Sequence, residues 1–354
     1  MSSRVVPLPQ VAGFSAYSLP RAPVRIDLPL DCNEGLRPPP ALLEACRAIE
    51  PDTIRRYPSA ARLAEVLAAR HGVDLRRVLV TAGADDALDR ILRALLTKGR
   101  EIIYPVPSFE AIERYTHLAG ATLVEIPWLQ GAYPRSEVLA AITERTSVIS
   151  VVTPNNPTGT VATIEDVRAV AEAAPHALVL LDQAYGELAD EDLTPKALEI
   201  PNVVVVRSLS KAFGLAGLRV GCALGASEVI DWLRAAGVPY ALSGPSLRIA
   251  EARLALPSED ITGYIERIRF ERTALYSLLR DLSYAPVPSQ ANFVFARMPS
   301  PLLLRDALAR RGIAIRVYPG KRHLEDAVRI TCPGDEGDFE RLCHALHESH
   351  REIS

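Results

Sequence analysis

The sequence lacks several features that would direct a protein to a membrane, an oxidising compartment or nucleic acid. No apolar run approaches the roughly 18 residues that a membrane span needs, and residues 1–21 lack the compact apolar core of a signal peptide. The five cysteines are scattered and form no CxxC pair, and the formal net charge is only -3. These absences predict a cytoplasmic protein with reduced thiols, without membrane or nucleic-acid partners.

The sequence also lacks the common nucleotide motifs and any convincing metal motif. GLAGLRVG does not fit the dinucleotide-binding pattern G-x-G-x-x-G, and no P-loop pattern occurs. His344, His347 and His350 recur every three residues near the C-terminus, but no paired ligand set accompanies them. We therefore expect a polar helix face there and no metal site.

Short apolar segments and helix-like segments alternate through most of the chain. Residues 1–40 are proline-rich and poor in periodicity, which predicts an extended arm. Residues 41–245 predict a large three-layer α/β/α domain with a mostly parallel sheet. Residues 246–354, with a long charged helix and two apolar strands, predict a smaller α+β domain.

Polar stretches follow four of the predicted strands of the large domain. Ligands collect at the carboxyl ends of strands in open α/β sheets, so these stretches are the first candidates for a site. Taken singly, each also has a structural explanation as a turn, a helix cap, an ion pair or a surface lysine. The four stretches are TAGAD at 81–85, TPNNPTG at 153–159, DQAY at 182–185 and SLSK at 208–211.

Together these stretches are more informative than any one of them. Asn156, Asp182 and Lys211 fall at the ends of successive predicted strands, and Arg219 lies eight residues beyond the lysine. Pyridoxal 5'-phosphate needs a lysine amine for its aldehyde, an acid for its ring nitrogen, a donor for its phenolic oxygen and an anion pocket for its phosphate. The sequence offers each of these groups.

The chain resembles the fold type I pyridoxal-phosphate aminotransferases, and within that family it is most similar to histidinol-phosphate aminotransferases. The similarity runs in family order from about residue 55 to residue 331. It is carried by RRYPS, GADDAL, YPVPSFEAI, TPNNPTG, LLDQAYGE, SLSKAFGLAGLRVG, PYALSGP, SQANFVFAR and AVRIT.

The resemblance implies roles for the residues around the cofactor. Lys211 would form the Schiff base and then move a proton between the substrate and the cofactor. Asp182 would keep the ring nitrogen protonated, and Asn156 and Tyr185 would bond the phenolic oxygen. The remaining cofactor-binding residues implied are the phosphate ligands Ser208, Ser210 and Arg219, and the backbone N–H groups of Ala84 and Asp85 at a helix start.

The resemblance also implies contacts with the substrate and with a second subunit. Phe109 would stack on the cofactor ring, and Tyr57 would reach the phosphate of the neighbouring subunit, so a homodimer with shared active sites is expected. Arg329 would bind a substrate carboxylate or phosphate. Arg316 is a second candidate for an anion, and Asn33 borders the substrate.

The chain departs from the family pattern near the substrate. Residues 33–36 read Asn-Glu-Gly-Leu where Asn-Glu-Asn-Pro is usual, and Phe109 replaces the usual tyrosine. The predicted reaction is transfer of an amino group from L-histidinol phosphate to 2-oxoglutarate. The alternatives are a related enzyme acting on another amino acid, whether an aromatic aminotransferase, a decarboxylase or an oxidase, and a regulatory protein that binds the cofactor without turnover.

Overall fold

The larger part of the molecule is built on a seven-stranded sheet. The computed structural model describes residues 5–12, 14 and 24–353. The strand order is β2-β8-β7-β6-β5-β3-β4, and only β8 runs antiparallel to its neighbours. The strands are β2 (Val78–Thr81), β3 (Glu101–Val106), β4 (Thr122–Pro127), β5 (Thr146–Val152), β6 (Leu178–Asp182), β7 (Val203–Ser208) and β8 (Gly221–Leu224).

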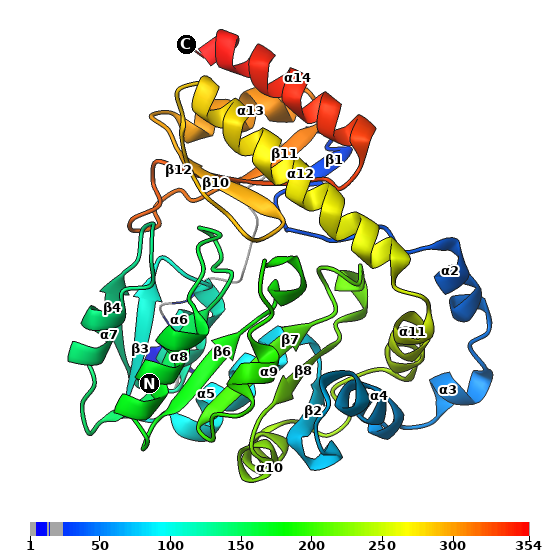
Figure 1. Cartoon of the computed structure of the whole chain (residues 1–354), viewed down its shortest axis with the longest axis vertical. Coiled ribbons are helices and arrows are strands. Elements are labelled where there is room, and N and C mark those ends of the chain that lie inside the picture. The colour runs from blue at the N-terminus through cyan, green and yellow to red at the C-terminus, as the bar shows by residue number, and fades with distance from the viewer. Residues whose placement is uncertain (1–4, 13, 15–23, 354) are drawn as a thin grey trace.

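Helices cover both faces of this sheet, because its central strands are apolar on both sides. Val203 and Val205 of β7 pack in one cluster with α4, α8 and α11, whereas Val204 and Val206 pack in another cluster with α5, α6 and α10. The three layers are visible in Figure 1, and the predicted α/β fold is confirmed. The helices of this part are α2 (Pro40–Arg47), α3 (Pro51–Arg55), α4 (Ala61–His71), α5 (Gly83–Leu95), α6 (Glu110–Leu118), α7 (Arg135–Ala140), α8 (Ile164–Ala173), α9 (Thr194–Ala197), α10 (Ser227–Ala236) and α11 (Gly244–Ala255).

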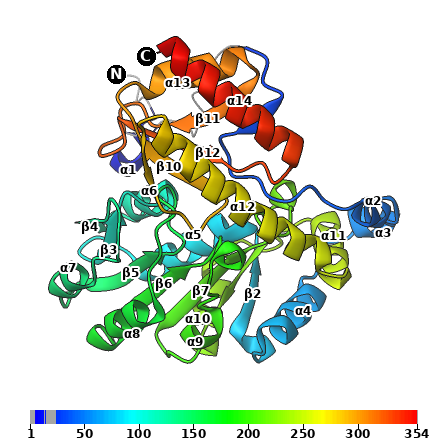
Figure 2. The same ribbon diagram turned by 45° about the horizontal axis from the view of Figure 1, so that its top comes forward.

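The smaller part is a five-stranded sheet with helices packed against it. The order is β1-β11-β12-β10-β9, and all pairs except β1 with β11 are antiparallel. The long helix α12 runs from beside α11 up to this sheet (Figure 2). The elements are β1 (Leu28–Leu30), α12 (Glu259–Asp281), β9 (Ala285–Val287), β10 (Phe293–Arg297), α13 (Pro301–Arg310), β11 (Ile313–Val317), β12 (Ala327–Thr331) and α14 (Glu336–Ile353).

Part of the proline-rich N-terminal region, which the sequence predicts as an extended arm contributing to the small domain and to dimer contacts, forms regular elements. Pro9–Ala12 form the short helix α1, and Leu28–Leu30 form β1, whose two leucines are buried in the core of the small domain. Pro29 is tolerated because β1 is an edge strand that pairs only with β11. The chain then crosses from the small sheet to α2 on the large domain through residues 31–36, which we call the strap.

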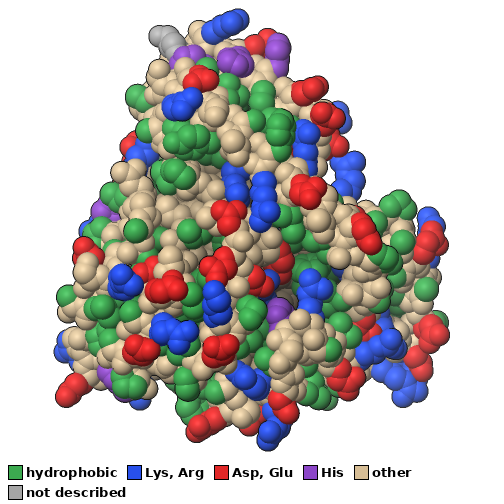
Figure 3. Space-filling view, in the orientation of Figure 1, with side chains coloured by type: hydrophobic (Ala, Val, Ile, Leu, Met, Phe, Trp, Pro, Cys, Tyr) green, Lys and Arg blue, Asp and Glu red, His purple; other side chains and the backbone are tan. Residues whose placement is uncertain are grey.

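The surface shows no concentration of one charge on the face seen in Figure 3, where acidic and basic side chains are interspersed. Within the described ranges, no helix is long and apolar enough to cross a membrane.

Candidate active site

One cavity of about 770 Å³ lies at the carboxyl ends of β5, β6 and β7, beneath the small domain. This volume is typical of small-molecule sites. Because the three strands are parallel neighbours, the residues that follow them must meet at one edge of the sheet. Every predicted site residue except Tyr57 lines this cavity: Asn33, Ala84, Asp85, Phe109, Asn156, Asp182, Tyr185, Ser208, Ser210, Lys211, Arg219, Arg316 and Arg329.

The amine of Lys211 lies against the strap. Its Nζ donates a hydrogen bond to the carbonyl oxygen of Asn33 at 2.9 Å and a longer one to that of Cys32 at 3.4 Å. The same nitrogen lies 5.4 Å from the centre of the Tyr185 ring. The lysine is thus held at the boundary between the two domains by groups that carry no full negative charge.

The backbone of the strap lies so close to the segment from Lys211 to Gly214 that neither segment has room for a side chain at the points of contact. A Cβ atom on Gly35 would lie 1.5 Å from the carbonyl oxygen of Lys211, and one on Gly214 would lie 2.1 Å from that of Leu36. Gly214 also has a φ of +72°, which favours glycine. The Gly35-Leu36 departure from the family pattern therefore has a structural consequence, since this backbone path has no room for a side chain at residue 35.

The carboxyl group of Asp182 is buried at the end of β6. It accepts a hydrogen bond from the backbone N–H of Ala184 at 2.9 Å. Burial raises its pKa from 3.8 to about 6, while that hydrogen bond and the charge of Lys211 act in the opposite direction. A carboxylate in this position would be stabilised by a cation placed beside it.

The side chain of Asn33 serves to position Tyr185. Its Nδ2 donates to the Tyr185 hydroxyl at 2.9 Å, and its Oδ1 accepts from the Thr331 hydroxyl at 2.8 Å. The backbone of Asn33 is left-handed, with φ of +56°. Because both ends of the amide are engaged, the group that this residue offers to the cavity beside Lys211 is its carbonyl oxygen. The contact of Asn33 with the substrate, which the resemblance implies, stays a prediction.

The far end of the cavity provides hydroxyl groups and a helix N-terminus. Ser208 and Ser210 line it, and the hydroxyl of Ser208 accepts a hydrogen bond from the backbone N–H of Ser210 at 3.1 Å. Ala84 and Asp85 are in the first turn of α5, whose dipole favours an anion. Arg219 crosses this turn and forms an ion pair of 3.0 Å with the Asp85 carboxylate.

Two arginines of the small sheet enter the cavity from above. Arg316 on β11 and Arg329 on β12 are directly opposite each other in the antiparallel pair, and both are buried. Like charges in this arrangement repel, so the pair favours an anion close by. Arg329 donates from Nη1 to Oδ1 of Asn156 at 2.6 Å and from Nη2 to the Asp31 carbonyl at 2.7 Å.

Arg329 retains hydrogen-bonding capacity toward a ligand. A guanidinium has five N–H groups, and two of those on Arg329 are used in the bonds just described. Its Nε is buried and has no hydrogen-bond partner among the residues that the structure describes. This arginine can therefore bind a carboxylate while it stays bonded to Asn156.

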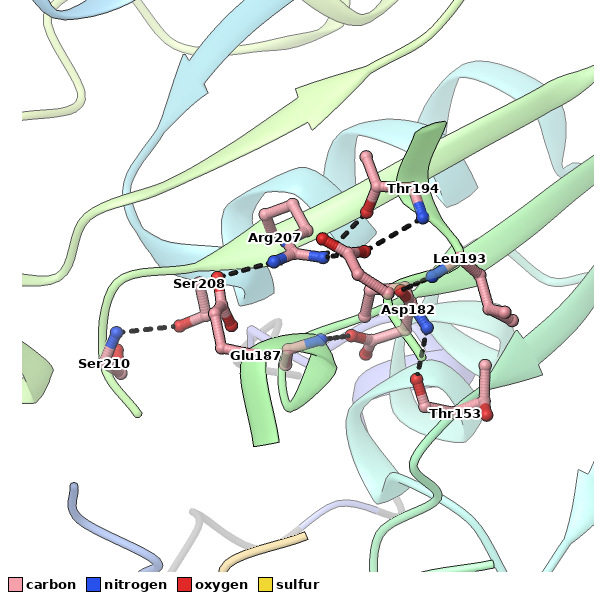
Figure 4. A network of polar contacts seen from close by, with 11 residues as sticks. Thr153, Asp182, Glu187, Leu193, Thr194, Arg207, Ser208 and Ser210 are labelled. Atoms are coloured by element: carbon pink, nitrogen blue, oxygen red, sulfur yellow. Dashed lines mark hydrogen bonds and ion pairs between the residues drawn. The ribbon is translucent and has the colours of Figure 1, made fainter. Parts of the chain in front are cut away.

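A charged network beneath the cavity was not predicted from the sequence. Arg207 on β7 is buried and forms ion pairs with Glu187 at 2.6 Å and with Asp192 at 2.7 Å (Figure 4). It also donates to the Thr194 hydroxyl at 2.7 Å. The only sign of this network in the sequence is a charged residue at the end of an apolar strand, just before Ser208.

Tyr57 lies outside the cavity of its own chain. Its side chain is 82% exposed and stacks on Tyr240 at a ring-centre distance of 4.5 Å. Its predicted contact with a second subunit stays a prediction. Phe109, in contrast, lines the cavity as the residue before α6, and its carbonyl accepts a hydrogen bond from the Tyr104 hydroxyl.

Comparison with known proteins identifies the family. The family model described as aminotransferase class I and II matches residues 28–346. The chain belongs to this family. The resemblance seen in the sequence is therefore confirmed, and the cofactor of the chain is pyridoxal 5'-phosphate.

Individual relatives of this aminotransferase carry two different names. An aromatic amino acid aminotransferase of Cutibacterium acnes is 34% identical over 90% of this chain and 92% of its own. A histidinol-phosphate aminotransferase of Caldanaerobacter subterraneus subsp. tengcongensis is 31% identical over 96% of this chain and 97% of its own. A solved histidinol-phosphate aminotransferase of Sinorhizobium meliloti, in complex with pyridoxal-5'-phosphate, has a TM-score of 0.84 at 27% identity, and the match covers 93% and 92% of the two chains.

The residues around the cavity fit this cofactor. A lysine amine, a buried carboxyl with a raised pKa and two serine hydroxyls beside a helix N-terminus line one cavity. These groups match the aldehyde, the ring nitrogen and the phosphate of the cofactor. Several other lining residues were missed in the sequence, because only the fold brings them to the cavity: Glu110, Glu113, Glu125, Tyr318, Lys321 and Arg322.

The raised pKa of Asp182 predicts a pH-dependent stability in the cofactor-free protein. Between about pH 4 and pH 6 the folded state binds the proton more tightly than the unfolded state, so the free energy of unfolding should fall as pH rises through this window, by up to about 3 kcal/mol. Asp182→Asn removes this loss. Urea unfolding should show the variant and the native protein equal near pH 4 and the variant more stable at pH 7. A difference that does not change with pH would contradict this assignment.

The close approach of Gly35 to the Lys211 carbonyl predicts that a side chain at residue 35 lowers both stability and substrate binding. Gly35→Ala should displace the strap from Lys211, lowering the free energy of unfolding by about 1–3 kcal/mol through overpacking and raising KM for the amino donor. Urea unfolding and steady-state kinetics measure the two effects. Gly217→Ala, where a Cβ would meet no described atom within 4 Å, is the matched control and should change neither. If Gly35→Ala and Gly217→Ala gave the same free energy of unfolding and the same KM, the close contact at Gly35 would not matter for stability or binding, which would contradict the prediction.

Proposed function

We propose that this aminotransferase moves the amino group of an L-amino acid with an uncharged aromatic side chain to 2-oxoglutarate. The observation that carries the proposal is the unequal state of the two arginines. The hydrogen bonds of Arg329 go to the neutral oxygens of Asn156 and Asp31, and its Nε remains for a substrate carboxylate, whereas Arg316 is paired with the Glu110 carboxylate. A donor with an α-carboxylate and a neutral side chain satisfies the first arginine and leaves the second pair intact.

The walls of the cavity support an aromatic side chain. Tyr104, Phe109, Tyr318 and Leu324 line it together with charged residues near its mouth. There Glu110 pairs with Arg316 and Lys321, Glu125 pairs with Arg322, and Glu113 adds a third carboxylate to the lining. A phosphate group entering this region would meet three carboxylates along with the three cations, and it would gain little from the net field.

L-Histidinol phosphate, the donor expected from the sequence, is the second candidate. Arg316, which lies directly opposite Arg329, could also contact its phosphate if Glu110 turned away, and relatives carrying both names match the chain at similar identity. This donor carries a phosphate ester in place of the α-carboxylate, so its phosphate is the group that Arg329 would bind.

The chain's own residues are arranged for proton transfer at the substrate. The bound cofactor supplies a ring that withdraws electrons from the α-carbon of the substrate. Lys211, which lines the cavity, would remove the proton from that carbon and return it at the cofactor carbon. Asp182 would stabilise the positive ring nitrogen, and Tyr185, fixed by Asn33, would donate to the phenolic oxygen.

A panel of amino donors tests the proposal directly. The purified enzyme, incubated with 2-oxoglutarate, should form glutamate from phenylalanine or tyrosine with a kcat/KM at least about ten times that for L-histidinol phosphate, because their α-carboxylate fits beside Arg329 while Arg316 keeps its pair with Glu110. Lys211→Ala is the inactive control. If glutamate formed only from histidinol phosphate, the aromatic donor would be rejected in favour of the second candidate. Release of carbon dioxide or peroxide in place of glutamate would reject aminotransfer.

A further inference from the structure

The carboxylate of Glu110, the first residue of α6 in the large domain, contacts two cations of the small domain. One oxygen lies 3.5 Å from Nη2 of Arg316, and the other lies 3.2 Å from Nζ of Lys321. Both cations belong to the small domain, on β11 and on the loop that follows it. A single side chain of the protein thus places a negative charge on the two cations at the outer end of the substrate cavity.

The two sides of this contact differ in their freedom to move. The Arg316 side chain is 10% exposed and extends from β11, directly opposite Arg329 on β12. Leaving such a cation without an anion would cost several kcal/mol. Glu110 is 37% exposed and Lys321 is 53% exposed, so each can turn toward solvent. The carboxylate can therefore leave, whereas the arginine cannot.

The proposed reaction requires both states. An aromatic donor brings no charge to the outer cavity, so Arg316 needs an anion from the protein. 2-Oxoglutarate brings a second carboxylate, for which Arg316 and Lys321 are the matching cations. We propose that Glu110 is an exchangeable counter-ion, which occupies Arg316 and Lys321 when the side chain of the substrate is neutral and is displaced by the distal carboxylate of a dicarboxylic substrate. This inference rests on the proposed function and names the residue that sets its specificity.

Removing the counter-ion should strengthen the binding of dicarboxylates. Glutarate is a suitable probe for the holoenzyme, because it has two carboxylates but neither an amino nor an oxo group and does not react. Glu110→Gln keeps the shape of the side chain and removes its charge, so the dissociation constant of glutarate, measured by calorimetry, should fall about 3- to 10-fold. That of 3-phenylpropionate, which has one carboxylate and a neutral ring, should stay the same or rise.

Glu113→Gln is the matched control. Glu113 lies in the same first turn of α6 and lines the same cavity, but among the described residues it forms no ion pair. It should change glutarate binding less than 2-fold. A gain as large as that of Glu110→Gln would mean that only the general field matters, and it would overturn the inference. So would unchanged glutarate binding in Glu110→Gln.

Lys321→Gln provides a second, independent variant on an exposed loop. It removes one of the two cations and should weaken glutarate binding roughly 2- to 5-fold; unchanged binding would count against the assigned subsite. The binding experiments do not depend on turnover. If no donor yields glutamate while glutarate still responds to Glu110→Gln, the proposed function fails and the exchangeable carboxylate stands. If glutamate forms but Glu110→Gln leaves the dissociation constant of glutarate unchanged, the proposed function stands and the role of Glu110 as an exchangeable counter-ion fails.

Discussion

The contact between the Lys211 ammonium group and the backbone carbonyls of the strap is the interaction on which the site depends. The strap follows β1 of the small sheet and leads toward α2 of the large domain, so it fixes the lysine only when both domains are in place. The absence of a side chain at Gly35 permits this contact, and the left-handed turn at Asn33 directs its amide to Tyr185. The positions of the Lys211 amine and the Tyr185 hydroxyl therefore both depend on the strap.

Several buried charged groups of the site lie where a ligand of opposite charge would stabilise them. Asp182 is a buried carboxyl with a pKa of about 6, which a positively charged ring nitrogen would lower again. Arg316 and Arg329 face each other across two strands and would be stabilised by an anion between or beside them. Such placement costs folding stability but orients the polar groups before the reaction begins.

Residues close to strand ends could be predicted from the sequence, because local pattern determines where a strand stops. Asn156, Asp182 and Lys211 follow three apolar runs, and the parallel order of those runs brings them together. Residues that depend on the packing of distant segments could not be predicted. Glu110 and Lys321 are 211 positions apart, and nothing in either local sequence indicates their contact. β1 was missed for a similar reason, since three residues with a central proline carry no strand pattern.

The central claim is that Lys211 is the residue that binds the aldehyde carbon of the cofactor, and reduction with borohydride tests it most directly. The sequence has four lysines, and Lys321 also lines the cavity. Borohydride treatment of the yellow holoenzyme, followed by proteolysis and mass spectrometry, should place the reduced cofactor on the peptide containing Lys211, and Lys211→Ala should carry none. Cofactor attached to Lys321, or retained covalently by the Lys211→Ala variant, would contradict the account.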